Sequence, residues 1–478
     1  MAKRSFPLLV ILGLLAQISA SARIINVPSD EPTIQAAIDV ATDGDTVLVA
    51  PGSYGENLNF LGKRVVLASH FILDRSFSYV NSTIIDGGSP SSADTASCVV
   101  IASGEDSTAV LQGFTITGGR GTKWVDPQFP SRTWRGGGGV LIFMSSPTIK
   151  NNVILGNEVT NTSGVNGAQG GGILSYGGNP LIQNNLIMEN EARYGAGIVI
   201  DYSGGVIKNN IIYRNTGGED YGGGGFWSIG NGATPIILEN NHIIQNAVTG
   251  SGAYGGRGGA MFVWYGSVTA RNNIIWGNTQ SRGGQIAEID GGTATLTYSD
   301  VEGGFPGEGN IDQEPAFADS SFHLASESPC IDAGAPDPVC SDPEDAAHPG
   351  YAEWPSLGNA TNDMGAYGGP ERDELPFFFL TAVHQNGKTA PGEFHLRQNY
   401  PNPFNPSTTI AYELPARAYV SMKVFNLLGE EVAVLVEGVE EPGSRSVRFE
   451  GRGIPSGVYI CRLSVEGLTQ TRKMIMAK

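Results

Sequence analysis

The sequence predicts an all-β protein whose central part is a solenoid of stacked β-strand coils. Two observations lead to this prediction: a high glycine content and a phrase that recurs along the middle of the chain. Glycine accounts for 67 of the 478 residues, and 44 of them lie between Gly113 and Gly309. A glycine inside a helix costs about 1 kcal/mol relative to alanine, so a mostly helical fold is excluded. A hydrophobic content of 40% is too high for a disordered chain.

The recurring phrase contains a pair of asparagines between two apolar strands. Its copies are SPTIKNNVILGN, NPLIQNNLIMEN, GGVIKNNIIYRN, PIILENNHIIQN and SVTARNNIIWGN, with Asn pairs that begin at 151, 184, 209, 240 and 272. Spacings of 33, 25, 31 and 32 residues leave room for short strands but for no crossover helix. Such a unit cannot bury its apolar side alone, so neighbouring units must stack into a parallel β-helix. We expect the first or second Asn to take the left-handed turn conformation, and the amides to form a ladder from coil to coil.

A second strand in each unit opens on glycines and precedes the phrase. Aligned on these glycines, the strands form three columns: Val140, Ile173, Ile198, Phe226 and Ala260; Leu141, Leu174, Val199, Trp227 and Met261; and Phe143, Tyr176, Asp201, Ile229 and Val263. Successive strand residues face opposite ways, and the phase that contains Ser175 and Ser228 suits a narrow interior. The residues that then face outward include Phe143, Tyr176, Asp201 and Trp227. Aromatic side chains on a flat sheet are surfaces on which sugar rings stack.

The residues before the repeats combine strands with one short amphipathic helix. Pro32 lies near the helix start, and the apolar stripe is Ile34, Ala37, Ile38 and Ala41. The segments PTIQAAI from Pro32, GDTV from Gly44 and PGSY from Pro51 resemble the N-terminal cap and first coils of right-handed parallel β-helix, pectin-lyase-like proteins. The resemblance implies that the helix covers the open end of a solenoid spanning residues 23–370. Residues 300–370 are its acidic closing segment.

An N-terminal export signal and four cysteines bear on where the protein folds. An apolar run from Phe6 to Ile18 follows two basic residues and ends before Ala-Ser-Ala, which predicts a secretory signal peptide at residues 1–22. The run is shorter than the roughly 20 residues that cross a bilayer. The cysteines are Cys98, Cys330, Cys340 and Cys461. In an exported protein Cys330 and Cys340 could close a short loop, although four free or buried thiols fit equally well.

Residues 393–478 form a second domain, which a linker at residues 371–392 joins to the first. Five alternating runs predict a small Ig-like antiparallel β-sandwich. NYPNPFNPSTTI, VFNLLGEEV, IPSGVYICRL and the final TRKMIMAK closely resemble the C-terminal sorting domain of the type IX secretion system, with Phe449 where tryptophan is common. The resemblance implies passage across a Gram-negative outer membrane to the cell surface or extracellular space. An accessory Ig-like domain without a sorting role is the alternative.

The chain has a net charge of −18, and its acidity belongs to the β-helix part, because the C-terminal domain is nearly neutral. Such acidity argues against nucleic acid as a partner and favours a polysaccharide that is neutral or bridged by cations. The repeats lack the adjacent Asp pair, the Gly-His-Gly and the Arg-x-Lys that polygalacturonase-like hydrolases use. We therefore predict a monomeric surface protein that binds polysaccharide. A polysaccharide lyase or glycoside hydrolase and a non-catalytic structural protein are the alternatives, so catalysis stays open.

The candidate site is the outward face of the glycine-led strands. The candidate substrate-binding residues are Phe143, Tyr176 and Trp227 on that face and Trp124 and Trp134 in an insertion at residues 120–135. This insertion either folds over the face and buries it or forms one wall of a groove. The candidate catalytic carboxylates are Asp201, Glu219 and Asp220.

The acidic closing segment offers a candidate calcium site. From Asp300 to Glu374 there are seventeen acidic residues and one basic residue. Calcium prefers hard oxygen ligands, and the candidate ligands are Asp332, Asp337, Asp342 and Asp345. Solvated acidic loops are the alternative explanation of this composition.

Overall fold

The computed structural model describes residues 22–375, except 219, 231–233, 253, 320, 347 and 374, and most of residues 395–476. The gaps in the second range are 397–398, 400–401, 403, 415–417, 427–430, 441–442, 452 and 466–467. The predicted signal peptide, except its last residue, and most of the predicted linker lie outside the described residues. Within the described part, we find no helix with the length and apolar character needed to span a membrane.

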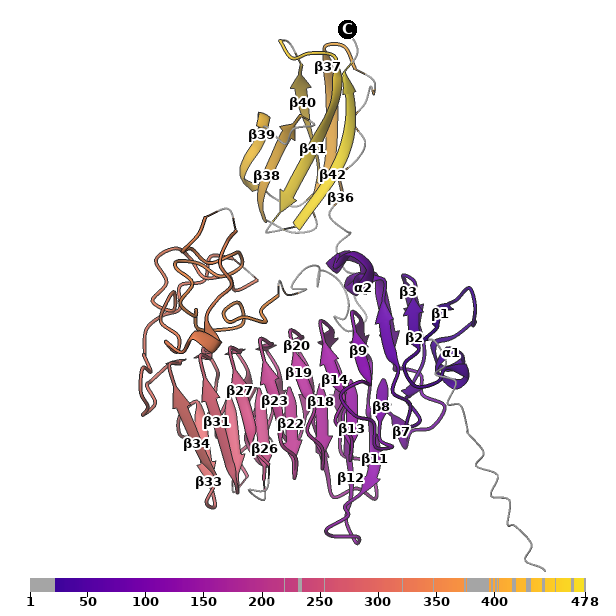
Figure 1. The fold of residues 1–478 in the computed structure, drawn as a ribbon, viewed down its shortest axis with the longest axis vertical. Helices are drawn as coiled ribbons and strands as arrows, with labels where there is room; N and C mark the ends of the chain where they lie inside the picture. The colour runs from indigo at the N-terminus through magenta and orange to yellow at the C-terminus, as the bar shows by residue number, and fades with distance from the viewer. Residues whose placement is uncertain are drawn as a thin grey trace, which may run out of the picture.

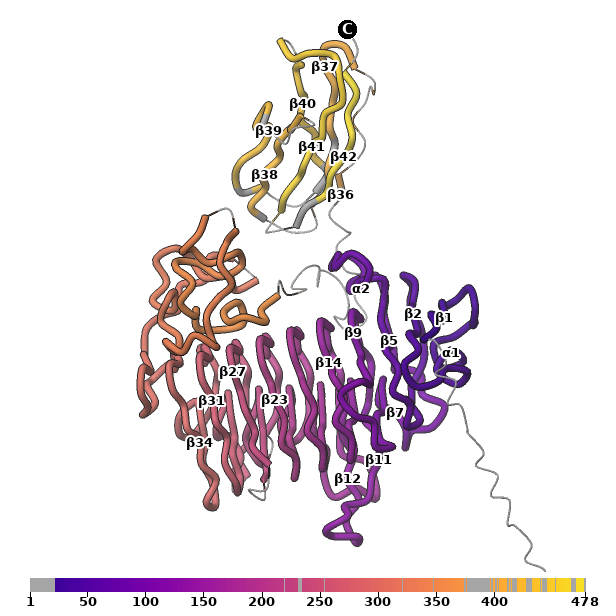
Figure 2. The backbone as a smooth tube through the Cα atoms, in the orientation of Figure 1, coloured from indigo at the N-terminus to yellow at the C-terminus, as the bar shows by residue number. Residues whose placement is uncertain are grey.

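Residues 24–301 form a parallel β-helix in which most coils add one strand to each of three long sheets, A, B and C (Figures 1 and 2). Sheet A consists of β1 (Ile24–Val27), β2 (Thr46–Val49), β5 (Val66–Ser69), β9 (Val110–Gln112), β14 (Thr148–Lys150), β19 (Leu181–Gln183), β23 (Gly205–Lys208), β27 (Ile236–Glu239), β31 (Ser267–Arg271) and β34 (Thr293–Thr297). Sheet B consists of β3 (Gly52–Tyr54), β6 (Thr83–Asp86), β10 (Thr115–Thr117), β15 (Val153–Leu155), β20 (Leu186–Met188), β24 (Ile211–Tyr213), β28 (His242–Ile244), β32 (Ile274–Trp276) and β35 (Asp300–Val301).

Sheet C carries the glycine-led strands. It consists of β4 (Leu58–Asn59), β8 (Val99–Ile101), β13 (Val140–Phe143), β18 (Ile173–Tyr176), β22 (Ile198–Asp201), β26 (Phe226–Ile229), β30 (Met261–Trp264) and β33 (Ile286–Ile289). A short parallel sheet follows sheet B and consists of β16 (Glu158–Val159), β21 (Glu191–Ala192), β25 (Thr216–Gly217) and β29 (Ala247–Val248). Ser175 and Ser228 are fully buried in the solenoid, so the predicted inward phase of sheet C is confirmed.

Two buried ladders of asparagine amides run along the turns on either side of sheet B. The second Asn of each pair forms the first ladder, with Nδ2···Oδ1 distances of 3.0–3.1 Å from Asn152 through to Asn273. The Asn that ends each phrase forms the second ladder, from Asn157 to Asn278, with distances of 2.9 Å. The first ladder confirms the prediction. The second was not predicted, although the final Asn of every phrase is its signal.

The first Asn of each pair takes the left-handed turn conformation, with φ between 51° and 58°. These side chains bind the closing segment, and Asn272 Nδ2 also donates to Asn240 Oδ1 at 3.2 Å. Asn209 Nδ2 donates to the carbonyl oxygens of Ala366 and Gly368 at 3.1 and 2.7 Å, and Asn184 Nδ2 donates to the carbonyl of Glu371 at 3.1 Å. The segment therefore runs back along the column of left-handed Asn residues, from later coils toward earlier ones.

The rest of the closing segment packs against the outer face of sheet B (orange in Figure 1). Its regular structure in the described part is a short 3₁₀ helix at Pro338–Cys340. Phe322, Met364 and Tyr367 share a buried cluster with Ile211 and Ile274 of the sheet. This acidic segment is thus a folded part of the β-helix domain, and its core is apolar.

Two carboxyl groups are buried inside the closing segment. Asp342 accepts a hydrogen bond from the amide of Asp363 at 3.0 Å, and Asp363 accepts from the amides of Asp332 and Leu357 at 2.8 and 2.7 Å. Burial raises the pKa of Asp342 to about 7. Burial and the neighbouring Asp342 raise the pKa of Asp363 to about 8.

The four cysteines form no disulfide, so Cys330 and Cys340 do not close a loop. All four are free and buried, which agrees with the alternative expectation. The Cys98 Sγ donates to the Thr117 carbonyl at 3.1 Å. The Cys330 Sγ donates to Asp300 Oδ2 at 3.3 Å, where the thiol contributes to packing of the closing segment on β35.

The predicted capping helix is α1 (Ile34–Val40), which lies beside β1 and β2 at the N-terminal end of the solenoid (Figure 1). The Thr33 side chain caps it by accepting from the amide of Ala36 at 3.1 Å. The predicted stripe is confirmed, because Ile34, Ala37 and Ile38 are fully buried. Two further short helices, α2 (Phe71–Asp74) and α3 (Phe77–Ser82), lie between sheets A and B in the next coil.

The C-terminal domain is the predicted antiparallel β-sandwich. One sheet consists of β36 (His395–Leu396), β37 (Ser407–Leu414) and β40 (Gly443–Glu450), and the other of β39 (Glu431–Glu440), β38 (Ala418–Phe425), β41 (Gly457–Val465) and β42 (Leu468–Met476). Ile410 and Phe449 from the first sheet share one buried core with Val424, Cys461 and Leu463 from the second.

We expect the stability of the closing segment to fall as pH rises from about 4 to about 8. The folded-state pKa values of Asp342 and Asp363 lie above the ordinary value of 3.8, so in this interval the folded state binds more protons than the unfolded state. The stabilisation is complete below the unfolded-state pKa and is lost as pH rises through the folded-state values. Hydrogen exchange of residues 335–373 at about pH 5 and about pH 9 measures the effect.

Asp363→Asn should reduce this pH dependence, because the amide does not ionise. The matched control is Asp337→Asn, at an exposed position in the same segment, which should behave as the wild type. Equal pH dependence in Asp363→Asn and the wild type would contradict the assignment.

We expect Asn215→Ala to destabilise the β-helix by about 2 kcal/mol or more, because it leaves buried partners unpaired on two coils. Asn215 accepts from Asn190 Nδ2 and donates to Asn246 Oδ1, both at 2.9 Å. Urea unfolding followed by circular dichroism measures the loss. The same substitution at the exposed Asn161 should change stability by less than about 0.5 kcal/mol, and equal losses would show that the ladder contributes nothing.

Candidate functional site

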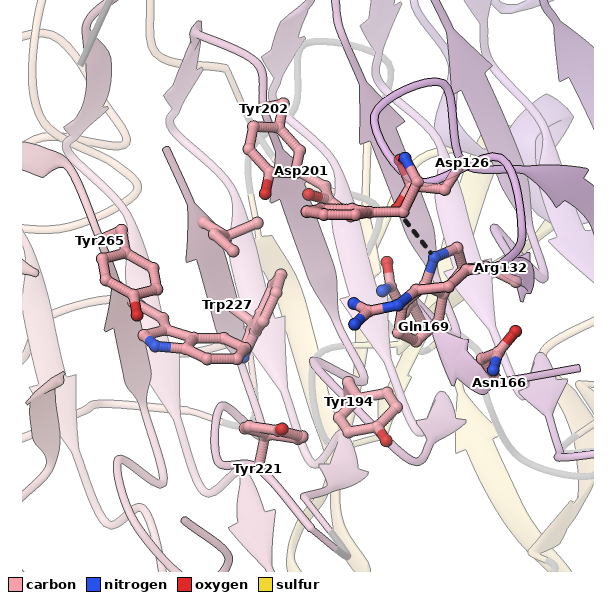
Figure 3. A pocket seen from close by; sticks show the side chains of 14 residues that line it. Asp126, Arg132, Asn166, Gln169, Tyr194, Asp201, Tyr202, Tyr221, Trp227 and Tyr265 are labelled. Carbon is pink, nitrogen blue, oxygen red and sulfur yellow. Dashed lines mark hydrogen bonds between the residues drawn. The ribbon is translucent and has the colours of Figure 1, made fainter. Parts of the chain in front are cut away.

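A cavity of about 480 Å³ lies on the outer face of sheet C, above β22 and β26 (Figure 3). The residues of its floor are Gln169, Asp201, Tyr202, Trp227 and Ile229. One wall consists of Asp126, Phe129, Arg132, Trp134 and Asn166, and the other of Tyr194, Tyr221, Trp264 and Tyr265. The cavity therefore combines several aromatic rings with a few carboxyl, amide and guanidinium groups, each of which has two or more polar atoms.

Apart from Asn166, the first wall comes from the insertion at residues 120–135. It folds into a hairpin of β11 (Gly121–Val125) and β12 (Thr133–Gly136), which are antiparallel. The hairpin is held on both sides, because β11 pairs with β7 (Thr95–Ala96) and β12 pairs with β17 (Gly167–Gln169). Its tip, which contains Asp126, Phe129 and Arg132, stands beside sheet C.

The hairpin covers one part of sheet C and forms one wall of the cavity over another part. The Trp124 ring lies 4.7 Å from that of Tyr176 and 5.6 Å from that of Phe143, and Tyr176 is only 1% exposed. Trp134, on the neighbouring strand, lines the cavity. Both alternatives for the insertion thus hold, each for a different stretch of the face. Of the predicted substrate-binding residues, Trp134 and Trp227 line the cavity, whereas Phe143, Tyr176 and Trp124 pack together outside it.

Asp126 organises the tip of the hairpin. Its Oδ1 accepts from the amides of Gln128 and Phe129 at 2.9 and 3.2 Å and from the Tyr176 hydroxyl at 3.3 Å. Its Oδ2 accepts from Trp134 Nε1 at 3.2 Å, which is the dashed line in Figure 3. The sequence analysis did not select Asp126. Its signal was a carboxylate directly after the strand that contains Trp124.

Asp201 lies at the end of β22, in register with Tyr176 on one side and Ile229 on the other. Of the catalytic candidates from the sequence, Asp201 is the one that the structure places in the cavity. The side chain is 4% exposed, and its Oδ1 has no hydrogen-bond partner. Burial, followed by the charge of Asp126, raises its pKa well above the ordinary value, and a hydrogen bond to Gln169 opposes the shift. The carboxyl group keeps its proton at a pH where an exposed aspartate has lost it.

The opposite wall is a continuous set of aromatic rings. The Tyr221 ring lies 5.0 Å from that of Tyr194, 4.9 Å from that of Trp264 and 5.5 Å from that of Tyr254. Trp264 is oriented by a 2.8 Å hydrogen bond from its Nε1 to Asp290. These rings come from successive coils, so the wall extends along the solenoid axis.

The predicted columns of sheet C are wrong by one residue at β30. Phe226 pairs with Met261 instead of Ala260, and Trp227 pairs with Phe262. Ala260 belongs to the preceding turn, where its carbonyl accepts from the Phe226 amide. A slip of one residue exchanges the two faces of a strand. The corrected register points Trp264 outward and explains why this side chain was missed.

Asp220, a second catalytic candidate, does not join Asp201. Asp220 forms an ion pair with Arg193 and does not line the cavity. Glu219 lies outside the described residues.

The candidate calcium ligands are distributed over the closing segment. Asp337 accepts from the amide of Val339 at 3.1 Å and Asp345 accepts from His348 at 2.7 Å, while Asp332 accepts from the amide of Asn359 at 2.9 Å. In the part of the chain that the structure describes, no group of three or more His, Cys, Asp or Glu side chains could hold a metal ion. Calcium binding by these residues stays a prediction.

Two family models match the chain. The model for the right-handed β-helix region matches residues 74–275, which include the coils that form the cavity. The model for the secretion system C-terminal sorting domain matches residues 398–477. No curated protein and no solved structure matches the chain. The first match gives the hand of the solenoid, and the second gives the role of the β-sandwich. The chain is therefore a right-handed β-helix protein that the type IX secretion system carries to the cell surface or the extracellular space.

Proposed function

We propose that the protein binds a polysaccharide through the cavity on sheet C. The observation that supports this function is the convergence of aromatic rings and planar polar side chains on one concave site. Aromatic rings pack against the apolar C–H face of a sugar ring. Side chains such as Asp126, Arg132 and Gln169 offer paired polar atoms to neighbouring hydroxyl groups.

The shape of the aromatic wall favours a polymer over a small molecule. Tyr194, Tyr221 and Trp264 follow one another from coil to coil, and coils of a parallel stack are about 4.8 Å apart. The rings thus offer repeated stacking positions along the solenoid axis. The strong negative charge of the chain favours a neutral glycan or one bridged by cations.

We expect Tyr221→Ala and Trp264→Ala each to weaken polysaccharide binding by about tenfold, which corresponds to about 1.4 kcal/mol of lost stacking. Affinity electrophoresis of the full chain through gels that contain a panel of neutral and acidic polysaccharides measures the change. Tyr351→Ala, at an exposed tyrosine of the closing segment, is the matched control and should bind as the wild type. If both cavity variants bound as the wild type does, the aromatic wall would not be part of the binding site.

A second candidate function is cleavage of the bound glycan by a glycoside hydrolase or lyase. It is favoured by two carboxyl groups on one cavity with contrasting surroundings: Asp201 is buried with a raised pKa, whereas Asp126 accepts four hydrogen bonds. In hydrolysis the protonated Asp201 would donate to the glycosidic oxygen, and Asp126 would take the proton of the attacking water.

Product analysis separates these functions. New reducing ends or unsaturated products, absent in Asp201→Asn, would support the enzyme. Retention without products would support binding alone. If the protein neither binds nor cleaves any of the polymers, the remaining function is that of a structural surface protein.

A further inference from the structure

Three polar atoms at the floor of the cavity are buried without a hydrogen-bond partner. They are Asp201 Oδ1, Gln169 Oε1 and Trp227 Nε1. They come from neighbouring coils, through β22, β17 and β26, and their side chains are each more than nine-tenths buried. A buried polar group without a partner costs about 1–3 kcal/mol. Three such groups around one cavity indicate that a ligand supplies the missing partners.

The chemistry of these atoms specifies what the ligand must offer. The Trp227 N–H needs an acceptor, and the Gln169 oxygen needs a donor. A protonated Asp201 carboxyl group can both donate and accept. A hydroxyl group also does both, so neighbouring hydroxyls on one ring can serve all three positions.

The charges around the floor argue against an anionic ligand. Asp126 faces Asp201 from the hairpin, and Tyr176 and Tyr202 face it from sheet C; the charge that acts on Asp201 is that of Asp126, whereas Arg132 acts on Tyr202. Arg132 is the cation among the described lining residues, but it is exposed, with its guanidinium 4.7 Å above the Phe129 ring. A further carboxylate on the floor would be desolvated beside Asp126 without a buried partner.

We propose that the cavity holds an uncharged sugar unit, whose hydroxyl groups complete the hydrogen bonds of Asp201, Gln169 and Trp227, and that it discriminates against uronates. This inference rests on the proposed polysaccharide binding and names its substrate class. Specificity then comes from the unpaired floor atoms, and the aromatic wall supplies affinity that does not depend on charge.

The test compares neutral and uronate polymers on the full wild-type chain. The probes are a soluble β-glucan, a mannan and a galactan against polygalacturonate and alginate, all with a chelator present so that no divalent cation bridges the acidic polymers. At least one neutral polymer should bind about tenfold or more tightly than both uronates. Uronate binding as tight as neutral binding would overturn this inference and leave the proposed function standing. Binding to none of the probes would overturn the proposed function itself.

Variants of the floor provide a second test. Asp201→Leu and Gln169→Leu replace the polar side chain by an apolar one and remove the hydrogen-bonding atoms, so each should weaken binding of the neutral polymer by about tenfold or more. Thermal unfolding first identifies the variants that fold, and Asn161→Ala is the surface control. Unchanged neutral binding in a folded floor variant would contradict the assigned contacts.

Discussion

In-register stacking of parallel coils is the constraint on which the rest of the structure depends. The buried side-chain amides of the ladder turns find partners on the neighbouring coil, in addition to backbone carbonyl groups close by. The ladders from Asn152 to Asn273 and from Asn157 to Asn278 form these contacts with one residue type repeated at one position. The Oδ1 of a ladder Asn accepts from the backbone N–H and the side-chain amide of the Asn on the preceding coil, so the ladders hold each coil in the register of its neighbours. The strands of sheets A, B and C pair in that same register.

The candidate site lies where the chain departs from this repetition. Turns that belong to a ladder cannot vary, whereas the segments that lead into sheet C carry no ladder and differ in length. The hairpin of β11 and β12 is the largest such departure. It buries Tyr176 beneath Trp124 and brings Asp126 to the same cavity as Asp201. A regular scaffold thus presents an irregular surface, which is a common way for repeat proteins to carry a binding site.

The closing segment shows how an acidic stretch can be part of a folded domain. Its backbone carbonyls satisfy the amides of the left-handed Asn column, which face away from the ladders. Several of its carboxylates accept hydrogen bonds from the segment's own amides, and Asp342 and Asp363 do so in a buried position. Sequence composition indicated the acidity but not this arrangement, because one partner of each contact is a backbone group that any sequence possesses.

Local periodicity by itself determined the fold of this protein. The Asn phrase established the parallel stack, the apolar spacing from Ile34 to Ala41 established the capping helix, and alternating runs with sorting motifs established the C-terminal sandwich. It also placed Asp201 and Trp227 on the candidate face, because strand alternation determines which side a residue occupies. Tertiary structure alone decided that Trp124 covers Tyr176, that Asp126 joins Asp201, and that Ala260 belongs to a turn so that Trp264 faces outward. The physical reason is that a repeat specifies contacts between equivalent residues on adjacent coils. The contacts of an insertion or a closing segment are made once each, between residues distant in the chain, and no period encodes them.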